Sequence, residues 1–300
     1  MKILVTGGAG YIGSHICKKL KKLNFDPIVI DNLSTGYREN VKWGKFFKID
    51  LQDKIKLSKI IKRINPRAVI HMVSNIEAGD SLKYIEKFYY NNVLTTLNIL
   101  NAMSENKVRY IIYSSTAAVY GNPEKLPLVE SSKTIPDNIY GSTKLISEKI
   151  IKDFASARNI NYCNLRYFNV AGADKDLEIG ENHQPETHLI PLLIEANLKK
   201  VKFNLYGNDY NTKDGTCIRD FVHVEDLADA HIKSLKKIFK SKLNCSINIG
   251  NGKGFSVKEI ISETEKQLGS KTKIKVKKRR SGDLKKLVAN IDFAKKKINW

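Results

Sequence analysis

The chain has little cysteine, and its four cysteines stand far apart. Cys17, Cys163, Cys217 and Cys245 are spread over 300 residues, and no two of them form a C-x-x-C pair. Cysteine zinc sites and small disulfide frameworks depend on closely spaced cysteines. The sequence therefore predicts neither of them, and no residue set is assigned to a metal. We expect the thiols to be reduced and mostly buried.

The sequence also lacks a long apolar segment. Its first apolar run begins at Ile3, which leaves no room ahead of it for the charged and apolar regions of a signal peptide. No later run approaches the roughly 18 to 20 apolar residues that a membrane span needs. With 42% hydrophobic residues, a chain of this length can bury a sizeable core. We expect a cytoplasmic globular protein with no membrane partner.

Acidic residues are scarce relative to basic ones. The chain has 52 Lys and Arg against 31 Asp and Glu, a net charge of +21, but only nine of the basic residues are Arg. Nucleic-acid binders rely on arginine for bidentate contacts and usually concentrate their charge on one element. Here the lysines are spread over the whole length, and only the stretch 273–280 is dense. We predict a solvated, lysine-rich surface and no nucleic-acid partner.

Short apolar runs alternate with longer periodic segments in the first half of the chain. The runs have the length and the β-branched or aromatic content of strands and cover 2–8, 27–31, 46–50, 68–73, 110–115 and 161–168, with periodic segments such as 13–23, 53–63 and 92–106 between them. This alternation predicts βαβ units and a parallel sheet covered on both faces. From about residue 171 the pattern breaks. The predicted fold is α/β, with a doubly wound parallel sheet over 1–170 and a smaller mixed α/β domain over 171–300.

A glycine-rich segment joins the first predicted strand to the first helix. Gly8, Gly10 and Gly13 form G-x-G-x-x-G, and Gly7 begins an offset frame. Glycines here permit a tight turn and the close approach of a pyrophosphate to a helix N-terminus. Asp31 ends the second strand, where a carboxylate would hold a ribose diol and repel a 2′-phosphate. The context predicts a Rossmann-type site for NAD rather than NADP, with a purely structural turn as the alternative.

Two polar patterns follow the fifth predicted strand. Ser114, Ser115 and Thr116 stand at its carboxyl end, where α/β sheets bind ligands. Tyr140 and Lys144 follow at a spacing of one helical turn, so both side chains leave on one face. A phenol has a pKa of about 10, and serving as a base near neutrality requires a fall of about 3, or about 4 kcal/mol. A nearby ammonium and an oxidised nicotinamide both favour the phenolate. A solvated helix face is the alternative for such a pair.

Seven segments, in order, carry a resemblance to a known family. They read GGAGYIGSH (7–15), SSTAAVYG (114–121), YGSTK (140–144), LRYFNVAGA (165–173), THLIP (187–191), YGNDYNTKDGTCIRDFVHVEDLADAH (206–231) and RRSGD (279–283). Together they resemble the successive signatures of the UDP-glucose 4-epimerase (UDP-galactose 4-epimerase) family, a group of extended short-chain dehydrogenases/reductases. The resemblance runs from residue 1 to about 300, and its most specific part is 206–231.

The resemblance implies a fold, a cofactor and a reaction. NAD stays bound to the first domain through the whole cycle, and the second domain holds the UDP-sugar. Tyr140, assisted by Lys144, takes the proton of the sugar 4-hydroxyl while the C4 hydride passes to the nicotinamide, and Thr116 orients the same oxygen. The 4-keto sugar then turns over and takes the hydride back on its other face. Two helices, at about 92–106 and 142–157, are implied to pair two copies into a homodimer.

The same resemblance implies two sets of binding residues. The residues matched to NAD contacts are Gly7, Gly10, Tyr11, Ile12, Gly13, Asp31, Asn32, Asp50, Leu51, Asn91, Tyr140, Lys144 and Tyr167. The residues matched to the UDP-sugar are Thr116, Asn169, His188, Leu189, Asn204, Tyr206, Arg219, Arg280 and Asp283. Arginine suits the pyrophosphate because its guanidinium fork matches phosphate oxygens.

The chain departs from the family pattern in several places. Residues 71–74 read His-Met-Val-Ser where the family commonly has His-Phe-Ala-Ala, and Ile76 stands where some members have Lys or Ser. Leu287 occupies the position whose size helps decide whether N-acetylated sugars fit, which favours unsubstituted UDP-hexoses. Most relatives also continue for some tens of residues beyond Trp300. The alternatives are a 4-epimerase of another nucleotide sugar, such as a UDP-N-acetylhexosamine or a UDP-pentose, and a catalytically impaired NAD-binding paralogue.

Overall fold

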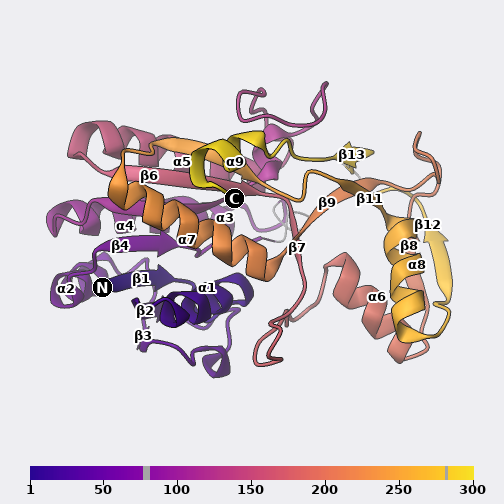
Figure 1. Cartoon of the computed structure of the whole chain (residues 1–300), viewed down its shortest axis with the longest axis horizontal. Coiled ribbons are helices and arrows are strands. Elements are labelled where there is room, and N and C mark those ends of the chain that lie inside the picture. The colour runs from indigo at the N-terminus through magenta and orange to yellow at the C-terminus, as the bar shows by residue number, and fades with distance from the viewer. Residues whose placement is uncertain (77–81, 281–282) are drawn as a thin grey trace.

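The computed structural model describes residues 1–76, 82–280 and 283–300. It contains a seven-stranded sheet in the order β10-β6-β5-β4-β1-β2-β3, with every neighbouring pair parallel (Figure 1). The strands are β1 (Lys2–Thr6), β2 (Asp26–Asp31), β3 (Lys45–Lys48), β4 (Ala68–His71), β5 (Tyr110–Thr116), β6 (Asn161–Tyr167) and β10 (Cys245–Ile249). The six predicted strands and the doubly wound parallel sheet are confirmed.

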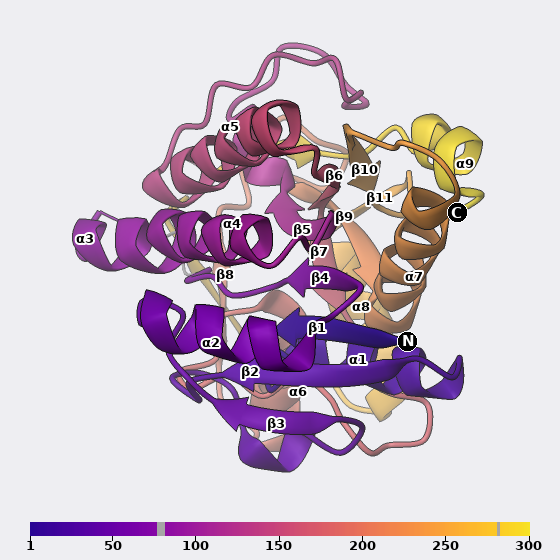
Figure 2. The same cartoon turned by 90° about the vertical axis from the view of Figure 1, so that its left-hand side faces the viewer.

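Strand β1 feeds two separate apolar cores, because successive side chains of a strand point to opposite faces. Ile3 and Val5 belong to one buried cluster, and Leu4 belongs to the other. The helices on the first face are α1 (Tyr11–Lys22), α7 (Val224–Lys240) and α9 (Asp292–Ile298), and those on the second are α2 (Lys54–Ile64), α4 (Thr95–Glu105) and α5 (Ile139–Arg158). Figure 2 shows the sheet between these two helical layers.

The helix predicted at 92–106 begins earlier than its periodicity indicates. Short helix α3 (Ile85–Phe88) runs through the π-helical turn η3 (Tyr89–Leu94) into α4, with right-handed helical dihedrals at both junctions. A π-helical turn widens a helix locally and is frequent at functional sites. Here it carries Asn91 and Asn92. Within the described residues, the other short helices are η1 (Arg38–Asn40) and η4 (Ala117–Tyr120).

A smaller mixed α/β part lies at the other end of the molecule (Figure 1). Its strand β9 (Ile218–His223) pairs with β7 (Asn169–Ala171), β11 (Gly254–Ser256) and β13 (Lys286–Leu287), and β8 (Phe203–Tyr206) pairs with β12 (Ile274–Lys277). Helices α6 (Leu189–Leu198) and α8 (Val257–Leu268) supply Leu193 and Ile261 to a core that also contains Phe203 and Leu205. The prediction of a smaller part with mixed α/β structure is confirmed.

The two parts do not divide the chain at one point. Strand β10 follows residue 171 in sequence but pairs with β6 in the large sheet, with Cys245 opposite Cys163. Helices α7 and α9 likewise cover the large sheet. The predicted boundary between 1–170 and 171–300 therefore marks only where the chain first leaves the large sheet. A short apolar run in the second half of the sequence does not indicate by itself which sheet it joins.

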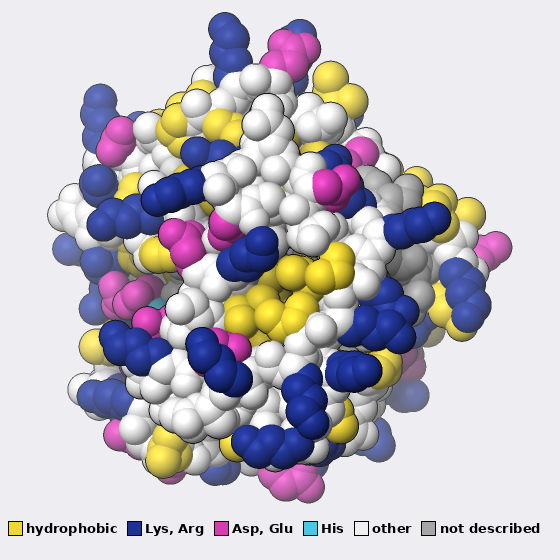
Figure 3. Space-filling view, turned by 90° about the vertical axis from the view of Figure 1, so that its right-hand side faces the viewer, with side chains coloured by type: hydrophobic (Ala, Val, Ile, Leu, Met, Phe, Trp, Pro, Cys, Tyr) yellow, Lys and Arg dark blue, Asp and Glu magenta, His cyan; other side chains and the backbone are white. Residues whose placement is uncertain are grey.

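The surface at the end of the molecule farthest from the seven-stranded sheet carries many basic side chains. Figure 3 shows Lys and Arg scattered around this face, with a patch of apolar side chains between them. Within the described residues, no helix is both long enough and apolar enough to cross a bilayer.

A buried ion pair ties α5 to β6. Arg166 donates from Nη2 to Oε2 of Glu148 at 2.6 Å and from Nε to Oε1 at 2.9 Å, and the two side chains are 8% and 6% exposed. Ser115 Oγ donates to the same Oε1 at 2.5 Å. Both charges are therefore paired and hydrogen-bonded, which a buried ion pair requires.

Arg166→Met should lower the free energy of unfolding by about 3 to 5 kcal/mol, because it leaves the Glu148 carboxylate buried without its cation. Urea unfolding measures the loss. The matched control is Lys199→Met, which breaks the exposed pair with Glu195 and should change stability by about 0.5 kcal/mol or less. Equal losses in the two variants would contradict the assignment.

Candidate active site

A cavity of about 490 Å³ opens at the carboxyl ends of the parallel strands. The chain winds from β1 to β2 and β3 on one side and continues with β4 on the other side of β1, which makes this edge a topological switch point where α/β sheets bind ligands. All residues matched to NAD contacts line it: Gly7, Gly10, Tyr11, Ile12, Gly13, Asp31, Asn32, Asp50, Leu51, Asn91, Tyr140, Lys144 and Tyr167. The structure thus brings the whole set together, and their role as NAD contacts stays a prediction.

The glycine-rich turn fits close against the start of α1. Gly10 N donates to Gly7 O at 3.2 Å, and a Cβ built on Gly13 would lie 2.2 Å from Gly7 O. Only glycine at position 13 therefore lets the helix approach the strand this closely. Among the described residues, no side chain caps α1 at Gly10, so its first N–H groups remain available to an anion. This is what a dinucleotide pyrophosphate requires of the turn.

Asp31 is fixed at the end of β2 by the backbone. Its carboxylate accepts the N–H of Ala9 at 3.0 Å and of Leu33 at 2.8 Å, and the residue is 8% exposed. Burial raises the pKa of Asp31, while the two backbone N–H groups oppose that shift. Next to it, Asn32 Nδ2 donates to Asp50 at 3.0 Å. These acceptors suit the hydroxyl groups of a ribose.

Helix α5 carries Tyr140 and Lys144 into the cavity. Asn138 caps the helix by accepting the N–H of Gly141 at 2.8 Å, and a Cβ on Gly141 would lie 2.6 Å from Ala118 O. The first turn of α5 therefore packs directly on the segment that follows β5. Lys144 Nζ lies 6.0 Å from the centroid of the Tyr140 ring, so the ammonium and the aromatic ring share one side of the helix.

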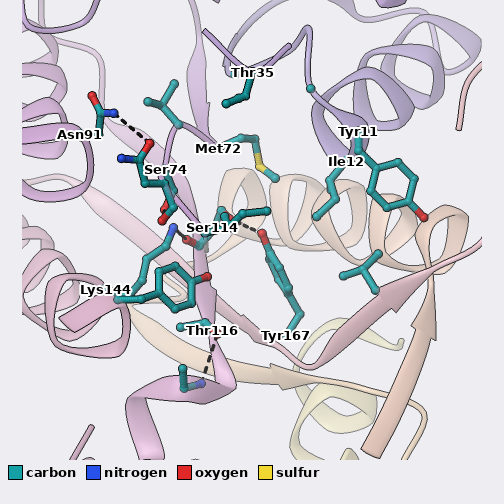
Figure 4. A pocket seen from close by; sticks show the side chains of 18 of the residues that line it. Tyr11, Ile12, Thr35, Met72, Ser74, Asn91, Ser114, Thr116, Lys144 and Tyr167 are labelled. Carbon is teal, nitrogen blue, oxygen red and sulfur yellow. Dashed lines mark hydrogen bonds between the residues drawn. The ribbon is translucent and has the colours of Figure 1, made fainter. Parts of the chain in front are cut away.

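Lys144 is held at the centre of the site. Its side chain is 1% exposed, and Nζ donates to the carbonyl of Ser114 at 2.7 Å. Burial lowers the pKa of Lys144 to about 7, and the nearby Glu148 carboxylate opposes that shift. The hydroxyls of Ser114 and Tyr167 hydrogen-bond to one another, and burial raises the pKa of Tyr167. Figure 4 shows Lys144, Ser114 and Tyr167 directed toward the same part of the cavity.

Thr116 lies beside this group at the end of β5. It is 9% exposed and lines the cavity, and its Oγ1 accepts the N–H of Ala118 at 3.2 Å (Figure 4). Among the described residues its hydroxyl acts only as an acceptor, which leaves its proton for an oxygen in the cavity. Thr116, Tyr140 and Lys144 therefore converge as the sequence predicts, and their catalytic roles stay predictions.

A second cavity of about 580 Å³ adjoins the first and shares Asn169, His188, Arg219 and Asp283 with it. The second cavity also contains Leu189, Asn204, Tyr206 and Arg280, so every residue matched to the UDP-sugar lines at least one of the two. Ser281 and Gly282 of the matching RRSGD segment lie outside the described residues.

Both arginines of the second cavity are already oriented. Arg219 pairs with Asp283 through Nη2 and donates from Nη1 to the carbonyl of Ile218 at 2.9 Å. The Arg280 guanidinium lies 4.2 Å from the centroid of the Tyr206 ring. Arg219 is therefore held by a carboxylate and a carbonyl, while Arg280 stacks on an aromatic ring, and among the described residues no acceptor for its guanidinium is found.

The departures from the family pattern face the first cavity. Met72, Val73, Ser74 and Ile76 line it on the side of β4, and Leu287 lines it from β13. His71 itself is fully buried, with hydrogen bonds to Thr6 Oγ1 at 2.7 Å and Thr96 Oγ1 at 3.1 Å. Burial lowers the pKa of His71 to about 3, so it adds no positive charge near Lys144.

Several supporting residues carry no motif. Asn92 Oδ1 accepts the N–H of Asn75 at 2.8 Å, and its Nδ2 donates to Thr143 Oγ1 at 2.9 Å. Asn75 Oδ1 in turn accepts from Asn91 at 2.9 Å (Figure 4). Glu148, on the next turn of α5, accepts hydrogen bonds from Ser115 and Arg166. In the sequence, such residues are visible only as polar residues on the apolar face of a helix, and this pattern does not identify their hydrogen-bond partners.

The glycine turn, the acid on β2 and the tyrosine–lysine pair on α5 define the class: a Rossmann-type nicotinamide dinucleotide enzyme. The model of the NAD dependent epimerase/dehydratase family matches residues 3–250. The chain belongs to that family.

The similar proteins match this chain over nearly its whole length. UDP-glucose 4-epimerase of Rhizobium meliloti (strain 1021) is 44% identical over 299 residues, which cover 99% of this chain and 91% of that protein. The crystal structure of UDP-glucose 4-epimerase from Brucella ovis in complex with NAD has a TM-score of 0.97 at 41% identity, covering 100% of this chain and 92% of that one. The UDP-Glc/GlcNAc 4-epimerase of Campylobacter jejuni has a TM-score of 0.87 at 38% identity, covering 100% and 93%.

Lys144→Met should stabilise the NAD-free protein more at low pH than at high pH. The pKa of Lys144 is about 7 in the folded protein against about 10.4 in an unfolded chain. The unfolded state therefore holds this proton more tightly, so the charged lysine destabilises the fold fully below about pH 7, and the effect fades toward about pH 10. The gain measured by urea unfolding should differ by on the order of 2 kcal/mol between about pH 6 and about pH 9.

The difference between the two pH values is the readout, because losing the hydrogen bond to Ser114 affects both. Lys149→Met, on the exposed side of the same helix, is the matched control and should show no such dependence. A Lys144→Met effect that is the same at both pH values would contradict the burial of this ammonium.

Proposed function

We propose that this chain is an NAD-dependent UDP-glucose 4-epimerase, which interconverts UDP-glucose and UDP-galactose through a 4-keto sugar. The observation that carries the proposal is that Lys144, Tyr140 and Thr116 line a cavity with dinucleotide-binding features, which adjoins a second cavity that contains Arg219 and Arg280. Relatives named UDP-glucose 4-epimerase that cover this whole chain support the choice of substrate.

The residues present fit NAD. The cradle at Gly7 and Gly13 would be filled by any side chain on Gly13, α1 offers uncapped N–H groups, and Asp31 presents a fixed carboxylate. When bound, NAD supplies the oxidation and re-reduction of the sugar C4 and is not consumed.

The chain's own residues move the proton. Tyr140, as phenolate, takes the 4-hydroxyl proton when the sugar is oxidised and returns it when the sugar is reduced. The Lys144 ammonium favours that phenolate because an opposite charge within about 6 Å stabilises the ionised form. Thr116 donates to the sugar oxygen and holds it near the phenol. Since both half-reactions use the same base, only a turn of the keto sugar between them inverts C4.

The arginines hold the part of the substrate that does not react. Arg219 and Arg280 present guanidinium groups to the second cavity, which suits the pyrophosphate of a UDP-sugar. Anchoring the UDP portion there leaves the hexose free to turn inside the first cavity. Asn169 and His188 line both cavities and stand at the passage between them.

The alternatives are not favoured. Leu287 lines the first cavity, and its bulk supports an unsubstituted hexose over an N-acetylated one. A catalytically impaired paralogue is not favoured either, and the presence of Tyr140, Lys144 and Thr116 in one cavity supports an active enzyme. The described cysteines are free, which supports the cytoplasm as the proposed location.

Tyr140→Phe should reduce conversion of UDP-galactose to UDP-glucose by about 100- to 10,000-fold, because it removes the acid–base group. Product analysis measures the rate, and co-purified NAD should be retained because the ring stays in place. Tyr110→Phe, at the opposite end of β5, is the matched control and should keep full activity. Retained activity in Tyr140→Phe would refute the proposed base.

We also propose that the chain forms a homodimer through α4 and α5. Leu97 on α4 and Ile146 on α5 are half-buried. Exposed apolar side chains also precede α4, at Ile85 on α3 and Tyr90 on η3, which are 44% and 55% exposed. Apolar surface of this kind marks an interaction site more often than a solvated face. Pairing of two such surfaces across a two-fold axis would bury them.

Leu97→Glu or Ile146→Glu should convert the dimer to a monomer, because a carboxylate would be buried unpaired in the interface. Sedimentation velocity measures the change. Leu198→Glu, which is exposed at the end of α6, should leave the dimer intact. A parent protein that sediments as a monomer would overturn this assembly.

A further inference from the structure

Four side chains of the segment between β7 and α6 point at one spot. Glu181, His183, Glu186 and His188 form the pattern E-x-H-x-x-E-x-H, and one ligand atom from each lies within 4.8 Å of all the others. No motif in the sequence marks these four residues as a group. The cluster lies beside the glycine turn, because the ring centroid of His183 is 6.3 Å from that of Tyr11.

The spacing of these atoms matches a tetrahedral metal site. His188 Nδ1 lies 3.0 Å from Glu181 Oε1 and 2.9 Å from Glu186 Oε1, and His183 Nδ1 lies 3.4 Å from Glu181 Oε1 and 3.7 Å from Glu186 Oε2. Bonds of about 2.0 to 2.2 Å from a tetrahedral Zn²⁺ to imidazole nitrogen and carboxylate oxygen place neighbouring ligand atoms about 3.3 Å apart. These four distances lie within about 0.4 Å of that value, and the other two pairs of ligand atoms lie within 4.8 Å.

The carboxylates of this cluster have no Lys or Arg partner among the described residues, although the chain has 52 basic residues. Their side chains are only 7% exposed at Glu181 and 14% at Glu186. The acidic group nearby differs in this respect. Asp174, Asp176 and Glu178 surround the ammonium of Lys18, a permanent cation. Glu181 and Glu186 have only the imidazoles of His183 and His188 beside them, which are charged only when protonated.

His183 supplies a second sign of a missing partner. Its Nδ1 is buried and makes no hydrogen bond within the described part of the chain. Buried polar atoms are otherwise almost always hydrogen-bonded. A metal ion between the two carboxylates would bind this nitrogen and balance both negative charges at once.

We propose that Glu181, His183, Glu186 and His188 bind one Zn²⁺ ion. Two imidazole nitrogens and two carboxylate oxygens suit Zn²⁺, and four protein ligands leave no open position, so the site is structural rather than catalytic. Glu186 Oε1 also accepts the N–H groups of Thr187 and His188 at 2.7 and 2.8 Å. The ion would thereby fix the end of the segment that leads into α6 and the second cavity. Because it would bind His188 only through Nδ1, it would leave Nε2 for the UDP-sugar contact proposed for this residue.

The test uses the full-length protein, treated with a chelator and then titrated with Zn²⁺ alone. The parent should bind one equivalent per chain, and substituted Co²⁺ should give the strong visible absorption of a tetrahedral complex. Glu181→Gln and His183→Gln each remove one ligand. Their affinity should fall by more than the roughly 10- to 100-fold that follows loss of an outer-shell partner.

Glu178→Gln is the matched control, because it removes a charge from the same segment without removing a ligand. It should bind Zn²⁺ as the parent does. The proposal is overturned if the parent holds no stoichiometric Zn²⁺, or if Glu181→Gln and His183→Gln bind as tightly as Glu178→Gln. The Zn²⁺ content of the parent is measured without any variant, so the proposal can be refuted even if a substitution prevents folding. Neither measurement depends on epimerase activity.

Discussion

The ammonium of Lys144 is buried at the meeting point of α5 and β5, where the Ser114 carbonyl is its direct hydrogen-bond partner and Glu148 adds a more distant negative charge. An ammonium taken out of water is unfavourable unless a negative charge is close. A phenolate on Tyr140, one turn away, would offset this penalty, and the ammonium in turn favours the phenolate. The two charges therefore depend on each other. The capped start of α5 and the glycine at position 141 hold both in place.

The parallel sheet explains why a pair on one helix meets groups from distant parts of the chain. All strands of a parallel sheet end at the same edge, so Gly7, Asp31, Thr116 and Tyr167 arrive together although they are far apart in sequence. The smaller part then closes over this edge through β7 and β9, whose register places Asn169 opposite Phe221. The shared wall between the two cavities follows from that pairing. Binding of the UDP portion and chemistry at the sugar can thus be served by different halves of one continuous site.

The sequence predicted what depends on local pattern and missed what depends on distant pairing. The glycine turn, the acid on β2 and the Tyr140–Lys144 spacing are local, and the structure brings all of them to one cavity. The ion pair of Glu148 and Arg166 joins a helix to a strand, and neither residue carries a motif. Strand β10 looks like any short apolar run until its partner β6 is known. Glu181 and His183 carry no signal comparable to paired cysteines, because their spacing in E-x-H-x-x-E-x-H matches no common metal-binding motif.

The proposed mechanism requires that Lys144 holds Tyr140 ionised in the working enzyme. Ultraviolet difference spectroscopy of the holoenzyme over a pH series measures this directly, because tyrosinate and tyrosine absorb differently. The account predicts the signal of one tyrosinate near neutral pH in the parent, its absence in Tyr140→Phe, and its displacement to alkaline pH in Lys144→Met. A parent spectrum without tyrosinate until the ordinary phenol range near pH 10 would contradict the account.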